Sequence, residues 1–443
     1  MIAWVRNTAS RTLAMLHDQH VGKIIWTSGV ILTGNLSSAA LGIVSFAIVA
    51  RSLGAEMLGY FALAQAYVLI INDLFNVQTW ESLIKFGAQK DNGHDLGRIV
   101  KTNILIEICS ALLAFTIAFT LIDEIGRILG WDRTLIDLAR LYSFYIPVTL
   151  TTLTIGVPRL YDKFAIIAKI QFVSAIVKLL LVLVVHYRGG GVRHFLLAYL
   201  AADVLTAVSL NVYSLVLVHR RGAVDWLRTR VKLRRDEIRF LWWTNLRTIV
   251  RIPVRQLDLL IMNQFLSMHV VGVYKTYKEL VGVISRLGDP LNQALYPEYA
   301  KLIGRDKVED SLTVTRKLNR ILLSVAIAVL AGYLLTSNFV ISRFFGAEYL
   351  AYMPAFFLLV LLNCINLYLT PLNSLFIAAG FARFSFFIVL GNNILYLAVA
   401  LVGSMFLGIY GLVLAFALQM IFNQGLKIYF LKKHSTGWST VIR

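Results

Sequence analysis

The strongest constraint on the fold of this chain is a series of twelve apolar windows, each bounded by charged residues. A helix needs about 20 mainly apolar residues to cross a hydrocarbon core roughly 30 Å thick. Hydrophobic residues make up 58% of the 443 residues and charged residues only 15%, which does not fit a water-exposed surface. The pattern predicts an all-α membrane protein with about 12 transmembrane helices. The windows cover residues 24–49, 58–77, 99–121, 137–157, 164–185, 195–218, 240–265, 270–296, 318–337, 352–376, 384–407 and 409–431.

Lysine and arginine are distributed unevenly between the connections of these windows. With a cytoplasmic N-terminus, the cytoplasmic segments hold 29 lysines and arginines and the outer connections hold six. Positive residues concentrate on the cytoplasmic side of membrane proteins. We therefore expect a multi-pass protein of the bacterial inner membrane with both termini in the cytoplasm. Basic loops against anionic headgroups also account for most of the net charge of +19, so no nucleic-acid partner is expected.

The chain carries a weak internal repeat at a shift of 213 residues. The shift places SLGAEMLGYFA (52–62) on FLSMHVVGVYK (265–275), so that Gly59 falls on Gly272. Six windows separate the two copies, which gives both halves the same orientation in the membrane. We expect two six-helix lobes related by a parallel pseudo-twofold repeat. The expected division is an N-terminal lobe (1–218), a basic cytoplasmic linker (219–239) and a C-terminal lobe (240–443).

Of the 43 lysines and arginines, 35 are counted with the connections and the adjoining window ends. The other eight lie inside the windows, where each costs at least about 2.5 kcal/mol at the bilayer centre if it faces lipid. Six of the eight lie in the seventh and eighth windows. At about 100° per residue, the charged residues of each of these two windows share one helix face, about 80° wide in the seventh and about 100° in the eighth. Two such faces predict a shared aqueous cavity. The eight are Arg140, Lys178, Arg247, Arg251, Arg255, Lys275, Lys278 and Arg286.

Positive charge exceeds negative charge on these two faces. Asp258, Glu279 and Asp289 neutralise at most half of the six cations, so the preferred guest of the cavity should be anionic. An alternative is that the cations pair with helices of the other half and only hold the bundle together. For Arg140 and Lys178, snorkelling towards a helix end is a further alternative.

The first half contributes mainly neutral polar groups. Asn35 in the first window and Asn72 and Asn76 in the second suit hydrogen bonding to sugar hydroxyls, although contacts between helices are an alternative. The 213-residue shift places Asp73 opposite Arg286, which suggests a gating pair. The expected substrate-binding residues are therefore Arg247, Arg251, Arg255, Lys275, Lys278, Arg286, Asn35, Asn72 and Asn76. The expected gating or ion-coupling residues are Asp73, Asp258, Glu279 and Asp289; no catalytic or metal-binding residue is expected.

Three motifs give the chain a family resemblance. They are ARSLGAEMLGYFALA (50–64), FGAEYLAYMP (345–354) and RQLDLLI (255–261). Together with two sets of six windows they resemble the polysaccharide flippases, which transport O-antigen and capsule repeat units, of the multidrug/oligosaccharidyl-lipid/polysaccharide (MOP) exporter superfamily. The resemblance implies two six-helix lobes that open alternately to the two sides of the membrane around a cationic central cavity.

The resemblance also implies the substrate and the partners. The expected cargo is undecaprenyl-pyrophosphate-linked oligosaccharide, carried from the cytoplasmic to the periplasmic leaflet by a monomer among membrane lipids. Polysaccharide polymerase and chain-length proteins are the other expected partners. No cofactor is expected, and coupling to H+ or Na+ through Asp73, Asp203 or Glu107 is left open. The alternatives are another MOP-type exporter, of lipid II or of drugs, and a membrane polysaccharide polymerase or assembly protein; the protein is expected not to be an enzyme.

Overall fold

The fold is described from a computed structural model that covers residues 19–87, 93–220, 229, 231, 233–250, 256–305 and 307–434. Within these ranges the regular structure is entirely helical. The protein is therefore an all-α protein, as the apolar windows predict.

Every predicted window falls on one or more described helices. The first two windows lie in one helix, α2 (Gln19–Phe75), which contains a break at Gly54. Gly54 has φ of 73°, a left-handed conformation that glycine adopts without strain. A break at this point separates the two windows without ending the helical run.

The apolar helices expose most of their surface. In α8 (Phe164–Tyr187), the most apolar stretch is only 11% buried inside the protein. Leu180 and Leu335 are 56% and 83% exposed, and such broad apolar surfaces are rare on water-soluble proteins. Among the described residues, seven helices are long and apolar enough to cross a membrane, or eight if one bent pair counts as a single span. The chain is a multi-pass membrane protein, and the number twelve stays a prediction.

The helices form two compact units. One unit comprises Ser37–Lys275, and the other comprises Thr276–Arg443 together with Met1–Leu36. This division follows packing, and the expected lobe and linker boundaries stay a prediction.

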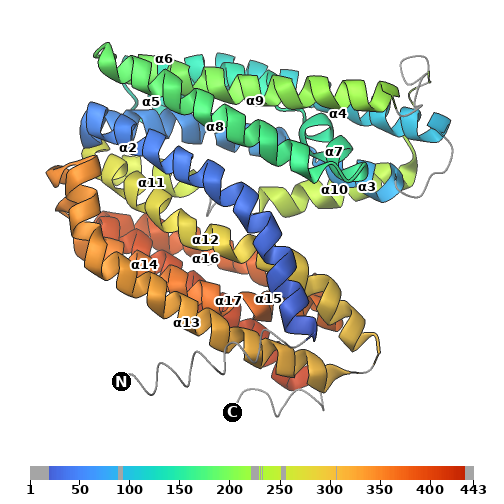
Figure 1. Ribbon diagram of the computed structural model, residues 1–443. Coiled ribbons are helices and arrows are strands. Elements are labelled where there is room, and N and C mark those ends of the chain that lie inside the picture. Colours follow the sequence, from blue (N-terminus) through green and yellow to red (C-terminus); the bar gives the residue numbers. More distant parts are fainter. Residues whose placement is uncertain are drawn as a thin grey trace. The chain divides into compact units, whose positions relative to one another are not determined.

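In the unit Ser37–Lys275, α8 packs against the next helix in the sequence, α9 (Val192–Arg220) (Figure 1). A buried cluster, which includes Leu83, Val157 and Val218, joins five elements of this unit. The elements after α2 are α3 (Thr79–Gly87), α4 (Gly93–Thr120), α5 (Ile122–Ile128), α6 (Arg133–Tyr142), η1 (Ser143–Val148), η2 (Thr152–Gly156), α7 (Val157–Leu160), α8, α9 (Val192–Arg220), α10 (Arg235–Ile249) and α11 (Asp258–Phe265).

In the other unit, α16 and α17 form the most extensive helix pair (Figure 1). Gly403 and Gly411 bring their backbones so close that a Cβ on Gly411 would lie 2.1 Å from the carbonyl carbon of Gly403. The elements are α12 (Met268–Ile303), which begins in the first unit, α13 (Val308–Val340), η4 (Ile341–Phe345), η5 (Ala347–Leu350), α14 (Met353–Tyr368), α15 (Thr370–Phe376), η6 (Ile377–Phe381), α16 (Ala382–Leu407) and α17 (Ile409–His434).

The two glycines matched by the 213-residue shift contact each other. A Cβ on Gly272 would lie 3.0 Å from the amide nitrogen of Gly59 and 1.8 Å from the carbonyl oxygen of Ala55. A Cβ on Gly59 would lie 2.2 Å from the carbonyl oxygen of Met268. Only residues without a side chain allow two helices to approach so closely. The repeat itself stays a prediction.

Candidate functional site

The predicted cationic faces lie partly outside the described residues. Arg251, Arg255 and the side chains of Arg247, Asp289 and Asn35 lie outside the described residues. On α12, Lys275, Lys278 and Glu279 are half-buried and Arg286 is exposed. The shared cavity on these faces, and the pairing of Asp73 with Arg286, stay predictions.

Asp258 is buried at the start of α11, where it is 1% exposed. One carboxylate oxygen accepts a hydrogen bond from the Leu259 amide at 2.9 Å, and the other accepts from the Tyr274 hydroxyl at 3.2 Å. The contact with Tyr274 joins α11 to α12, and the contact with Leu259 lies within the first turn of α11. They give Asp258 a structural role beside the expected gating role, which stays a prediction.

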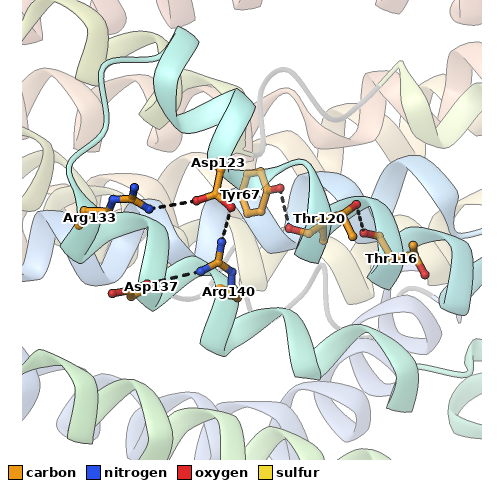
Figure 2. A network of polar contacts seen from close by, with 8 residues as sticks. Tyr67, Thr116, Thr120, Asp123, Arg133, Asp137 and Arg140 are labelled. Atoms are coloured by element: carbon orange, nitrogen blue, oxygen red, sulfur yellow. Dashed lines mark hydrogen bonds and ion pairs between the residues drawn. The ribbon is translucent and has the colours of Figure 1, made fainter.

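Arg140 belongs to a charged network at the end of α4 (Figure 2). Its guanidinium forms ion pairs with Asp123 at 2.5 Å and with Asp137 at 3.6 Å, and Arg133 also contacts Asp123, at 3.5 Å. Tyr67 donates to the Ala118 carbonyl nearby, at 2.9 Å. Two carboxylates therefore neutralise Arg140, so this residue has counter-charges within the protein.

Lys178 is also paired inside the bundle. Its ammonium lies 2.7 Å from one carboxylate oxygen of Asp203 and 4.6 Å from the ring centroid of Tyr199. The Tyr142 hydroxyl donates to the other oxygen of Asp203 at 2.8 Å. A resident ammonium thus balances Asp203, one of the three carboxylates considered for ion coupling.

A small pocket forms in the unit Ser37–Lys275 where two broken helices meet. Its volume is about 10 Å³, which is room for one water molecule or one ion. We call it the Glu107 pocket. It is lined by Asn72, Phe75, Asn76, Val77, Glu107, Ser110, Ala111, Ala114 and Thr149.

Both chain segments that flank the pocket leave the regular helix at this point. α2 ends at Phe75 and α3 begins at Thr79, with Gln78 in the left-handed region at φ of 49°. A second interruption lies between η1 and η2, at Thr149 and Leu150. Pro147, near the end of η1, precedes it. Non-helical backbone inside a membrane protein is tolerated where it is buried in protein or lines a cavity. Two breaks beside one pocket mark it as a candidate site.

The Glu107 carboxylate is 5% exposed and accepts hydrogen bonds from three threonines. The hydroxyls of Thr79 and Thr151 donate to one carboxylate oxygen, and the amide of Thr152 lies 3.0 Å from both oxygens. The Thr152 hydroxyl donates in turn to Thr79 at 2.7 Å. The hydroxyls of Thr79 and Thr151 and the amide of Thr152 thus present O–H or N–H groups to the carboxylate.

The structure brings together only some of the predicted site residues. Asn72 and Asn76 line the Glu107 pocket, and Asn72 accepts a hydrogen bond from Thr149 at 2.8 Å. The role of the two asparagines in sugar binding stays a prediction. Sequence reasoning considered Glu107 for ion coupling but missed Ser110 and Thr149. Two sequence features could have indicated the pocket. Glu107 is the one carboxylate in the window 99–121, and a run of threonines follows Pro147.

A buried ion pair joins α4 to the start of α10. The Arg98 guanidinium contacts both carboxylate oxygens of Glu237, at 2.7 and 3.3 Å. Both side chains are less than a tenth exposed. Nearby, the Lys101 ammonium donates to the Thr229 carbonyl at 2.9 Å. The contacts fix Thr229 and the start of α10 on α4.

We expect Glu237→Gln to lower the free energy of unfolding by about 3 kcal/mol at neutral pH, because it leaves Arg98 buried without a counter-charge. Burial raises the pKa of Glu237, but hydrogen bonds and charges from Arg98 and Arg234 outweigh it and bring the pKa below the ordinary 4.5. The contribution of Glu237 to the free energy of unfolding is therefore fully present above pH 4.5. It is lost as the pH falls through the lower pKa that Glu237 has in the folded protein.

Melting curves of the purified protein across this pH range measure the effect. The difference between wild type and Glu237→Gln should shrink as the pH falls below 4.5. Glu124→Gln is the control, since Glu124 pairs with Arg127 on the surface and should contribute less than about 1 kcal/mol. Equal melting of wild type and Glu237→Gln at neutral pH would contradict the assignment.

The family of this chain is shown by a match to one protein family, and a curated relative is similar to it. Residues 26–303 match a family described as "Polysaccharide biosynthesis protein". The inner membrane protein YghQ of Escherichia coli (strain K12) is 23% identical over 337 residues, which are 74% of this chain and 94% of YghQ.

Two solved structures share the fold. An inward-facing multidrug resistance transporter of the MATE family, in the MOP superfamily, matches with a TM-score of 0.72 and 14% identity over 90% of this chain and 96% of its own. The lipid II flippase MurJ, in an inward closed conformation, matches with a TM-score of 0.70 and 13% identity over 91% of this chain and 87% of its own. At these identities the likeness shows the fold alone. With a match that covers more than half of its length, the chain belongs to the polysaccharide biosynthesis protein family and has the fold of the MOP superfamily.

Proposed function

We propose that this protein is a flippase that moves a polyprenyl-pyrophosphate-linked oligosaccharide from the cytoplasmic to the periplasmic leaflet by alternating access. The observation that carries the proposal is the charge of residues 247–289, where six lysines and arginines stand against three carboxylates in a membrane-protein family of polysaccharide biosynthesis. Pyrophosphate is a double phosphate, and guanidinium groups bind phosphate oxygens in bidentate fashion. The protein acts as a carrier and not as an enzyme.

The physical task is to bring a charged, hydrated headgroup through hydrocarbon. An unpaired charge in the bilayer centre is costly, and a wet path lined by cations removes most of that cost. The polyprenyl tail stays in the lipid throughout, because it is as apolar as the surrounding acyl chains. Arg140 and Lys178 already have counter-charges, because Arg140 pairs with Asp123 and Lys178 pairs with Asp203.

The alternatives differ in the charge or the chemistry of the cargo. A drug exporter with cationic guests needs an excess of acidic groups, which is the opposite of the excess here. The fold match to a lipid II flippase favours a lipid-linked glycan as the cargo. It supports lipid II and an oligosaccharide repeat unit equally, because both present a pyrophosphate. Polysaccharide polymerase and chain-length proteins are the proposed neighbours in the inner membrane, where they would use the cargo after it has crossed.

Deletion of the gene in its host tests the function. We expect surface polysaccharide to disappear and the lipid-linked repeat unit to accumulate with its glycan on the cytoplasmic side. A plasmid copy of the gene should restore both. Normal surface polysaccharide in the deletion strain, with arrested peptidoglycan synthesis in its place, would favour lipid II as the cargo and overturn the repeat-unit proposal.

A further inference from the structure

One face of α10 is held on the unit Ser37–Lys275 by its own contacts. Glu237 pairs with Arg98, and the Phe240 ring meets the Phe86 ring edge to face with 5.6 Å between the centroids. The Lys85 ammonium lies 4.2 Å from the centroid of the Phe240 ring. Along this face α10 lies beside α3 (Figure 1). The contacts fix which side of α10 points away from the protein.

The side that points away combines charged with large apolar groups. At about 100° per residue, its five side chains fall within an arc of about 140°. Trp242 is 68% exposed and Trp243 is 56% exposed. We call this surface the α10 outer face, and its members are Arg235, Ile238, Arg239, Trp242 and Trp243. Two exposed indole rings beside two exposed guanidinium groups indicate a surface with a partner.

The α10 outer face carries an excess of positive charge. Arg235 and Arg239 are exposed, and within the described ranges neither forms an ion pair. Asp236 is the exposed carboxylate beside them and can balance one arginine. Glu237 is buried and already pairs with Arg98. Charge complementarity therefore calls for an anionic partner.

The order of side chains along α10 matches the layers of a bilayer surface. The two arginines come first, and the two tryptophans follow where the apolar window 240–265 begins. Tryptophan is enriched at the level of the headgroups, and basic residues next to a span attract anionic lipid. A free phosphate ion would leave the indole rings in water, and an apolar partner would leave the guanidinium groups without a counter-charge. A phospholipid with an anionic headgroup satisfies both.

We propose that the α10 outer face binds an anionic phospholipid of the surrounding membrane. Arg235 and Arg239 contact its phosphate, and Trp242 and Trp243 lie against its glycerol and the upper part of its acyl chains. The lipid and the buried ion pair of Glu237 then hold α10 from opposite sides. The proposal does not rest on the transported lipid, since phospholipid binding is measured without it.

Binding of phosphatidylglycerol to the purified full-length protein is the test. Delipidated protein in a neutral detergent is titrated with phosphatidylglycerol, with zwitterionic phosphatidylcholine or with inorganic phosphate, and the melting temperature is recorded. We expect phosphatidylglycerol to raise the melting temperature to a plateau, and the other two to have much smaller effects. Arg235→Gln/Arg239→Gln should weaken phosphatidylglycerol binding roughly 25-fold, because each basic residue near anionic lipid contributes roughly fivefold.

Arg316→Gln/Arg320→Gln is the matched control. These two arginines are also exposed and four residues apart, but they lie on α13, which contains no tryptophan. The variant removes the same charge from the protein, so it separates the α10 outer face from a general effect of net charge. We expect it to bind phosphatidylglycerol nearly as wild type does.

Brominated phospholipids locate the site, because bromine quenches the fluorescence of a tryptophan that it contacts. Brominated phosphatidylglycerol should quench wild type more than brominated phosphatidylcholine, and Trp242→Phe/Trp243→Phe, which keeps two aromatic rings, should lose this excess. The proposal is overturned if phosphatidylcholine or inorganic phosphate stabilises wild type as much as phosphatidylglycerol does. It is equally overturned if the α13 variant loses as much binding as the α10 variant, or if the excess quenching survives in the phenylalanine variant.

Discussion

Arg251→Ala together with Arg255→Ala should abolish surface polysaccharide in a complemented deletion strain while the protein level stays normal. In the sequence these two arginines and Arg247 recur every four residues, so a helix places them along one face. Each loses a charge-assisted contact worth about 1.5–3 kcal/mol, which corresponds to a loss in rate of roughly ten- to a hundredfold for each change. Both together should remove detectable transport.

Matched variants separate charge from geometry in this experiment. Arg251→Lys and Arg255→Lys keep the positive charge and lose the bidentate fork, so they should retain part of the activity. Arg127→Ala removes an exposed arginine, 73% exposed in a surface ion pair, and should transport as wild type. Full complementation by both alanine variants would show that these arginines do not meet the cargo.

Gly272→Ala should lower the free energy of unfolding by about 3 kcal/mol or more, because the new methyl group has no space. It would lie 1.8 Å from the carbonyl oxygen of Ala55, a backbone atom that cannot rotate away. The same argument applies to Gly59→Ala, whose methyl group would lie 2.2 Å from the Met268 carbonyl oxygen. Protein yield in membranes and melting temperature in detergent measure the effect.

Gly282→Ala is the control within the same helix. A Cβ at Gly282 would have no atom within 4 Å, and alanine is the better helix former by up to about 1 kcal/mol. We therefore expect Gly282→Ala to melt at or above the wild-type temperature. If Gly272→Ala and Gly282→Ala melt alike, the close approach of α2 and α12 is not a feature of the folded protein.

Much of the fold follows from local sequence, because the length and hydropathy of each window fix a helix without reference to the rest of the chain. The window 195–218, for example, lies within α9 (Val192–Arg220). The 213-residue shift matched Gly59 with Gly272 but did not predict that the two glycines contact each other. The window 240–265 is less regular, since its described parts form two separate helices, α10 and α11.

The polar sites were harder to predict, because their partners are distant in sequence. Glu237 pairs with Arg98, 139 residues away, and Asp203 pairs with Lys178 across two helices. The Glu107 pocket requires two helix breaks, near residues 76–78 and 149–150, to meet at one point. Periodicity within one helix cannot reveal such a meeting. It identified Asn72 and Asn76 as polar exceptions but not their neighbours Thr149 and Ser110.

The most direct measurement of the central claim is transport by the purified protein in liposomes that contain undecaprenyl-pyrophosphate-linked oligosaccharide. A membrane-impermeant lectin reports how much glycan has reached the outer surface. We expect wild type to make the inner-leaflet glycan accessible, and liposomes with Arg251→Ala/Arg255→Ala protein to match protein-free liposomes. An equal rate for a neutral glycolipid without phosphate, or no difference between wild type and the double variant, would contradict a cationic path for an anionic headgroup.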